Sequence, residues 1–185
     1  MSREYAATET LRRTTLVALY GSYAATLSAL AWAARRRSLP LPLPPRPAAV
    51  LGIGLGVTGA AIAVAGIGHL GSVAQVSGSE PEALVGAGLY RSSRNPQYLG
   101  LCALMAGAAL ASRSGLAAAV AGFGTAVLVH WIPNEERHLE RVFGEDYRRY
   151  AAAVPRWVWP IGSLPAREPG FRPTRAPARR SARSG

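Results

Sequence analysis

Gly88-Leu-Tyr-Arg-Ser-Ser-Arg-Asn-Pro-Gln-Tyr-Leu-Gly100 opens the stretch of sequence that decides the fold, and Asn134-Glu-Glu-Arg-His-Leu-Glu-Arg-Val-Phe-Gly-Glu-Asp-Tyr-Arg-Arg-Tyr150 closes it. Between these two polar segments the only charged residue is Arg113. An apolar excursion of this kind forms a helical hairpin in lipid, and a hairpin returns its second end to the level of its first. We therefore expect the two polar segments to meet at a membrane surface, where a charged cofactor and an apolar substrate can bind side by side.

Charge is distributed unevenly over the 185 residues. The formal charge is +11, from 21 basic residues, all of them arginine, and 10 acidic residues. Four runs without any of these residues, at 14–34, 47–79, 95–112 and 114–134, cover about half of the chain. A soluble domain alternates polar and apolar faces, so runs of this length indicate a lipid environment. The sequence predicts an all-α integral membrane protein with four hydrophobic helical segments, the last two forming a short hairpin followed by amphipathic cytoplasmic helices.

The runs also predict the domain organisation. We expect an N-terminal segment at 1–13, transmembrane helices at 14–34 and 48–71, and between them a loop at 35–47 rich in proline and arginine. Residues 72–164 are expected to form a core that contains the hairpin at 96–132, and 165–185 a disordered basic tail. After Pro133 the pattern predicts a new helix that Asn134 caps, with Gly144 as a break between two short helices.

Glycines in the second apolar segment favour close helix packing. Gly52, Gly56 and Ala60 recur on one helix face, and small residues in this spacing let helices approach closely in lipid. The same segment contains Gly54-Leu-Gly-Val-Thr-Gly59, which matches a dinucleotide-binding pattern. That pattern binds a nucleotide only between a strand and a helix, so helix packing is the better interpretation here.

The arginines predict the orientation of the chain in the membrane. More of them lie near the membrane on the side of the two polar segments than on the other side, which places those segments in the cytoplasm. Arg35, Arg36 and Arg37 directly follow the first apolar segment and argue locally for the opposite orientation. Because the larger number of arginines lies on the side of the polar segments, we expect a protein of the cytoplasmic membrane whose site faces the cytoplasm.

The polar segments carry residues with both an ordinary and a functional interpretation. Asn95 and Pro96 suit the cap and first turn of a helix. Glu135 and Glu136 are either solvated first-turn carboxylates or a pair that holds an ammonium group. Arg156 either contacts lipid headgroups or forms a bidentate pair with a carboxylate. The single cysteine, Cys102, excludes a disulfide within the chain, and no set of ligands has metal-binding spacing, so no metal is expected.

Taken together, these segments resemble the isoprenylcysteine carboxyl methyltransferase and phospholipid methyltransferase group of integral membrane enzymes. The resemblance covers residues 88–157 and rests on the order and spacing of Gly88, Tyr90, Arg94, Asn95, Pro96, Tyr98 and Gly100, then Glu135, Glu136, Leu139, Phe143, Gly144, Tyr147 and Tyr150, and finally Val154, Pro155 and Arg156. The first two apolar segments share only their hydrophobicity with this group.

The resemblance implies S-adenosylmethionine as cofactor and methyl transfer to a lipophilic acceptor at the cytoplasmic membrane face. It implies a cofactor pocket lined by Arg94, Asn95, Tyr98 and Gly100, with Glu135 or Glu136 at the ammonium group of the cofactor. Arg156 and Tyr147 are the implied residues near the methyl acceptor, which presents a carboxylate, a thiol or an amine. Asn95 departs from the histidine of the eukaryotic carboxyl methyltransferases and matches bacterial relatives. Because asparagine is not a base at neutral pH, another group must remove any proton.

Two other functions remain open at this point. Membrane reductases that use NADPH share part of this architecture, but they need groups for a nucleotide phosphate. A non-catalytic membrane protein would use the arginine-rich tail to bind anionic lipid or a partner, with the motifs as caps and anchors. We expect membrane lipids and a lipophilic substrate as partners and no nucleic acid, and the sequence indicates no oligomeric state.

Overall fold

The computed structural model describes residues 13–69 and 88–158. Within them the chain forms α1 (Arg13–Arg36), α2 (Pro45–His69), the 3-10 turn η2 (Gly88–Arg91), α4 (Pro96–Ser112), α5 (Gly115–Phe143) and α6 (Glu145–Ala153). The predicted all-helical class is confirmed. The expected basic tail at 165–185 and most of the loop after α2 lie outside the described residues.

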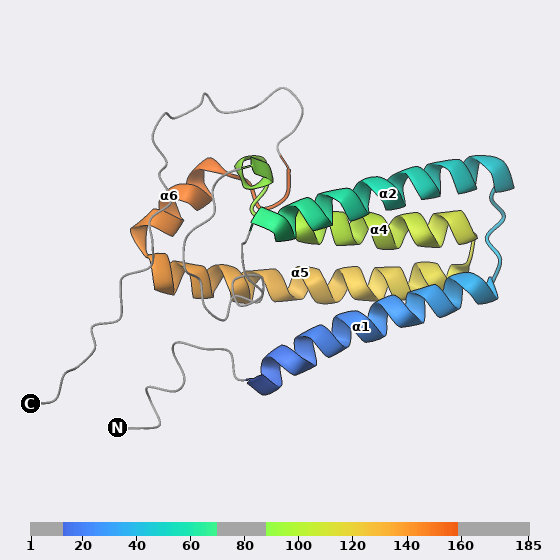
Figure 1. Cartoon of the computed structure of the whole chain (residues 1–185), viewed down its shortest axis with the longest axis horizontal. Coiled ribbons are helices and arrows are strands. Elements are labelled where there is room, and N and C mark those ends of the chain that lie inside the picture. The colour runs from blue at the N-terminus through green and yellow to red at the C-terminus, as the bar shows by residue number, and fades with distance from the viewer. Residues whose placement is uncertain (1–12, 70–87, 159–185) are drawn as a thin grey trace, which may run out of the picture.

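The four long helices run side by side, and α6 and η2 lie together at one end of the bundle (Figure 1). Helix α2 packs most extensively on α4, while α4 and α1 both pack on α5. The turn between α4 and α5 lies at the opposite end, next to the end of α1 and the start of α2. This arrangement brings the start of α4 and the end of α5, which carry the polar segments, to the same end.

Two helices of the described part, α2 and α5, are long and apolar enough to cross a membrane, and α4 is a shorter apolar helix. Their outward faces carry large apolar side chains that nothing in the described residues covers. Val50, Val57 and Val64 of α2 and Phe123 of α5 are each more than 60% exposed. Exposure of this extent along a helix is typical of a surface in contact with lipid.

Small residues hold α2 and α4 in backbone contact. A Cβ atom on Gly59 would lie 2.5 Å from the backbone nitrogen of Leu104 and 2.6 Å from the carbonyl oxygen of Gly100. Gly52 meets the backbone of Gly107 in the same way, with a would-be Cβ 2.7 Å from its carbonyl oxygen. The expected close packing of this helix is confirmed, but Gly59 makes the second close contact in place of Gly56, whose would-be Cβ meets nothing closer than 4.0 Å. The dinucleotide-like pattern is part of a continuous helix.

Two helix boundaries differ from the expectation, and both involve proline. Helix α2 begins at Pro45, inside the expected loop, because a proline in the first turn lacks only an N–H that would have no partner there. Helix α5 continues through Pro133, so the expected new start after Pro133 is wrong. Ile132 is fully buried on one side of this proline, and Glu135 bonds to α4 on the other. These tertiary contacts keep the helix continuous across the proline. The break at Gly144 is confirmed.

Gly59→Ala should destabilise the bundle, whereas Gly54→Ala in the same helix should not. The methyl group at position 59 meets the backbone of α4, and overpacking of this kind costs about 1–3 kcal/mol. At position 54 nothing lies within 4 Å of the added atom, and alanine favours a helix over glycine. Thermal unfolding of the two variants in detergent measures the difference. Equal midpoints would show that α2 and α4 are not in backbone contact.

Candidate functional site

The segment before α4 and the segment after α6 are joined by three hydrogen bonds. The backbone N–H of Arg94 donates to the carbonyl oxygen of Pro155 at 2.9 Å. The carbonyl oxygen of Arg156 accepts from the Asn95 side chain at 3.1 Å and from the Ser93 hydroxyl at 3.3 Å. Ser93 and Asn95 are both buried, so water does not compete for these bonds. The structure thus brings the two polar segments together, as their sequence predicts.

Buried tyrosines extend this junction into η2 and α6. The Tyr150 hydroxyl donates to the carbonyl oxygen of Tyr90, and the Tyr90 hydroxyl donates to Gln97 Oε1, each at 2.9 Å. Burial raises the pKa of the Tyr90 and Tyr150 phenols above their usual value, so both remain neutral donors. Tyr150 also packs with Phe143, Tyr147 and Val154. The sequence indicated Tyr150 only as one of the residues that carry the resemblance, and the polar role of its hydroxyl gives no sequence signal.

Glu135 and Glu136 point to different surroundings because consecutive residues of a helix lie about 100° apart around its axis. The Glu135 carboxylate accepts a hydrogen bond from the Tyr98 hydroxyl at 2.8 Å. The Glu136 carboxylate pairs with Arg156, with oxygen to nitrogen distances of 2.5 Å and 3.2 Å, and with Arg94 at 3.5 Å. The side chain of Glu136 is only 12% exposed, and its hydrogen bonds raise the pKa of the Arg156 guanidinium.

A polar cavity of about 400 Å³ opens beside this ion-paired group. Arg94, Glu136, Tyr147 and Arg156 line it, together with residues that include Arg137 and Glu140. The Arg94 Nε atom is buried and has no hydrogen-bond partner in the described residues. Burial and the negative charge of Glu136 raise the pKa of the Tyr147 phenol, with Arg94 opposing them. Tyr147 is therefore a neutral hydrogen-bond donor and cannot serve as a base at neutral pH.

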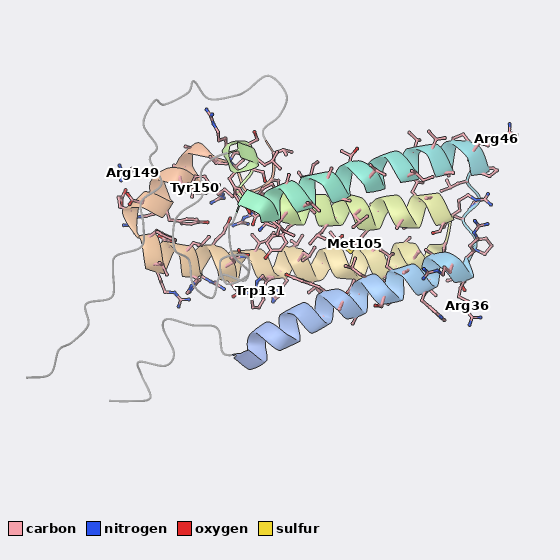
Figure 2. The ribbon with its side chains drawn as sticks, in the orientation of Figure 1. Arg36, Arg46, Met105, Trp131, Arg149 and Tyr150 are labelled. Carbon is pink, nitrogen blue, oxygen red and sulfur yellow. The ribbon has the colours of Figure 1, made fainter. Side chains whose placement is uncertain are left out.

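An apolar cavity of about 180 Å³ lies deeper in the bundle, between α1, α2, α4 and α5. Its walls include Tyr23, Tyr98, Met105 and Leu128, and Met105 lies between the long helices in Figure 2. Tyr98 is 5% exposed, and its hydroxyl is the atom that bonds to Glu135. Tyr98 thus links the apolar cavity to Glu135, the residue next to Glu136 of the polar cavity.

The structure distributes the predicted site residues over three places. Arg94, Glu136, Tyr147 and Arg156 line the polar cavity, and Tyr98 lines the apolar one and binds Glu135. Asn95 and Gly100 line neither of these cavities. Asn95 precedes α4 as expected, but its side chain makes no capping bond because it binds Arg156. Gly100 contacts the backbone of α2, and its role at a cofactor stays a prediction.

Ser93, Arg137 and Glu140 belong to this region and were not predicted. Ser93 bonds the carbonyl oxygen of Arg156, a contact between residues far apart in sequence. Glu140 lies four residues after Glu136 on α5, and residues at this spacing share a helix face, so the spacing from Glu136 is the signal that would have identified it. Arg137 directly follows Glu136, about 100° further around the helix, and its place at the cavity gives no such signal.

Comparison with models of protein families matches residues 47–146 to that of the phospholipid methyltransferases. The matched region begins in α2 and ends in α6, so it contains the glycine contact, the hairpin and the double glutamate. No curated protein and no solved structure matches the chain.

Asn95→Ala should loosen the junction between the two polar segments. Without the buried Asn95 amide, the Arg156 carbonyl oxygen keeps only the Ser93 hydroxyl as a donor. This loss costs about 1–3 kcal/mol of the free energy that holds the two segments together. Limited proteolysis should then cut faster after Arg156, while the exposed Ser92→Ala control should be cut like the parent protein. Equal cleavage of both variants would show that the Asn95 bond does not hold the segment in place.

Proposed function

Because the chain belongs to the phospholipid methyltransferase family, we propose that it methylates the headgroup of a phospholipid at the cytoplasmic face of a membrane. Membership in this family, which is related to the isoprenylcysteine carboxyl methyltransferases, makes the chain a membrane methyltransferase that uses S-adenosylmethionine. It also decides against the reductase and the non-catalytic protein that the sequence left open. The family match does not say which residues bind the cofactor and the acceptor, so we assign them from the geometry of the site.

The ion-paired group of Arg94, Glu136 and Arg156 is the observation that supports a cofactor site in the polar cavity. The amino acid end of S-adenosylmethionine carries an ammonium and a carboxylate on one carbon. A carboxylate flanked by two guanidiniums offers a partner for each charge, and the buried Arg94 Nε lacks an acceptor among the described residues. The cavity volume of about 400 Å³ falls within the usual range for small-molecule sites, about 300–1,000 Å³. The residues present therefore fit this cofactor.

When bound, the cofactor supplies a methyl group that its sulfonium already activates. The protein has to align donor and acceptor and to exclude water. In our proposal Arg94, Glu136 and Arg156 hold and orient the cofactor, and the neutral Tyr147 hydroxyl donates a hydrogen bond at the same cavity. The apolar cavity next to Tyr98 holds the first part of an acyl chain of the acceptor, which enters from the lipid between the helices.

We further propose that the reacting group of the acceptor is an amine. Glu135 forms no ion pair with an arginine of the described part, in contrast to Glu136. It bonds to Tyr98, which lines the apolar cavity, and its neighbour Glu136 lines the polar one. An unpaired carboxylate in this position suits a positively charged amine headgroup. Before methylation such an amine must release a proton, and the Glu135 carboxylate, positioned by the hydrogen bond from the Tyr98 hydroxyl, can take it. Asn95 cannot, because an amide does not titrate and its side chain is bonded to Arg156.

Glu136→Gln should weaken S-adenosylmethionine binding by about 10-fold to 100-fold, because hydrogen bonds to a charged partner contribute about 1.5–3 kcal/mol. Isothermal titration calorimetry on the purified protein measures this. The control is Glu145→Gln, an exposed carboxylate on α6 that does not line the cavity, and it should bind the cofactor like the parent protein. Unchanged affinity of the Glu136 variant would place the cofactor elsewhere.

Tyr98→Phe should retain cofactor affinity within about two-fold and lower the rate of methyl transfer by about 100-fold, the usual scale for loss of a positioned acid–base group. The assay follows labelled methyl from S-adenosylmethionine into phosphatidylethanolamine vesicles. Label in the lipid extract supports the proposed acceptor class. Cofactor binding without label in this lipid would contradict the amine acceptor, and a fully active Tyr98→Phe variant would contradict the role of the hydroxyl.

A further inference from the structure

Five arginines gather at the end of the bundle opposite the polar cavity. They are Arg35, Arg36, Arg37, Arg46 and Arg113, and we refer to them as the arginine end. Figure 2 shows Arg36 and Arg46 at this end and Arg149 and Tyr150 at the other. Arg35, Arg36, Arg37 and Arg46 are exposed and Arg113 is partly exposed. Neither the methyl transfer nor the family match gives these residues a function.

The charge of the arginine end is not compensated within the described part of the chain. Every carboxylate there lies at Glu135 or beyond, at the opposite end of the bundle. The salt bridges of the described residues join those carboxylates to Arg94, Arg148, Arg149 and Arg156. The arginine end takes part in none of them, so its guanidinium groups are available to an external anion.

Helix dipoles explain only part of this cluster. Arg35 and Arg36 occupy the last turn of α1, where the negative end of the dipole favours a cation. Arg46 occupies the first turn of α2, where the positive end of the dipole opposes one. The dipole of α2 therefore does not account for Arg46, and no carboxylate of the described residues lies beside it.

Hydrogen bonds hold the arginine end in one shape. The Leu41 N–H donates to the Arg113 carbonyl and the Gly115 N–H donates to the Leu39 carbonyl, each at 2.8 Å. The Arg113 guanidinium donates to the Leu43 carbonyl at 2.9 Å. The Ser114 hydroxyl, fully buried, donates to the Ser38 carbonyl at 2.9 Å. The loop from α1 to α2 is thus hydrogen-bonded to the turn between α4 and α5, and these bonds fix the backbone positions of the arginines relative to one another.

Exposed apolar groups accompany the arginines, one in the last turns of α1 and one in the loop that follows it. Leu39 is 70% exposed and has a φ of 54°, a left-handed conformation that a branched side chain rarely adopts. Trp32 is 54% exposed, and the Arg36 guanidinium lies 5.6 Å from the centroid of its ring. Cations interspersed with an exposed tryptophan and an exposed leucine suit the boundary between headgroups and acyl chains.

We propose that the arginine end binds the headgroups of anionic phospholipids in the membrane leaflet opposite the polar cavity. The guanidinium groups pair with phosphate oxygens, a geometry that arginine matches with two parallel hydrogen bonds. Trp32 and Leu39 contact the adjoining part of the acyl chains. This site is separate from the methyl-transfer site, and the proposal holds whichever acceptor the enzyme uses.

The test measures lipid binding to the purified full chain by native mass spectrometry in detergent, with added phosphatidylglycerol or phosphatidylcholine. We expect preferential binding of phosphatidylglycerol. Substitution of Arg35, Arg36 and Arg37 by glutamine should weaken it by about 100-fold, since each arginine near an anionic surface contributes on the order of 1 kcal/mol. The control removes the same charge from the other end by substituting Arg91, Arg141 and Arg149, which are exposed and line neither cavity, and should retain the preference.

A second variant guards against misfolding of the triple substitution. Arg46→Gln removes a cation that the helix dipole opposes, so it should not destabilise α2, yet it should weaken phosphatidylglycerol binding by about five-fold. Inorganic phosphate at the same concentration should not compete. Equal binding of both lipids, equal loss in the control variant, or displacement by free phosphate would overturn the proposal.

Discussion

The carbonyl oxygen of Arg156 accepts hydrogen bonds from Ser93 and Asn95, and the polar end of the molecule is arranged around this contact. It fixes the backbone after α6 against the start of α4. With the backbone fixed, the Arg156 side chain reaches the Glu136 carboxylate, and Arg94 approaches the same carboxylate from the other segment. A loop that moved freely would lose most of this ion pairing to solvent and to side-chain entropy. Burial of Ser93 and Asn95 is what makes the contact durable.

Helix geometry then assigns different chemistry to two adjacent identical residues. Glu136 faces the polar cavity and two arginines, whereas Glu135 faces inward to Tyr98. In the proposed function, the charge-paired Glu136 serves the zwitterionic end of the cofactor and the neighbouring Glu135 serves a cationic headgroup. The apolar cavity behind Tyr98 adds room for a hydrocarbon chain. In the proposed function, a polar cofactor and a lipid approach the same point from different solvents.

Packing in lipid imposes a separate constraint on the other half of the molecule. Apolar burial contributes little to helix association in a membrane, so α2 and α4 rely on backbone contact through glycines such as Gly59 and Gly100. This contact places the N-terminus of α4, and with it Arg94 and Tyr98, in register with the end of α5. The fastened loop and turn at the arginine end hold the other ends of the same helices. The bundle is thus tied at both ends, with ion-paired arginines at the end of the polar cavity and, among the described residues, arginines without a carboxylate partner at the other.

The sequence by itself determined the helical class, the close packing of the second apolar segment and the break at Gly144, because apolar runs and glycines act locally. Only the structure showed that the partner of that segment is α4. Motif spacing also indicated Arg94, Glu136, Tyr147 and Arg156, which the structure gathers around one cavity. Tertiary structure alone decided that α5 passes through Pro133, that Asn95 binds Arg156 and that Tyr98 is the partner of Glu135. Each of these depends on a partner distant along the chain, and local propensity carries no information about such a partner.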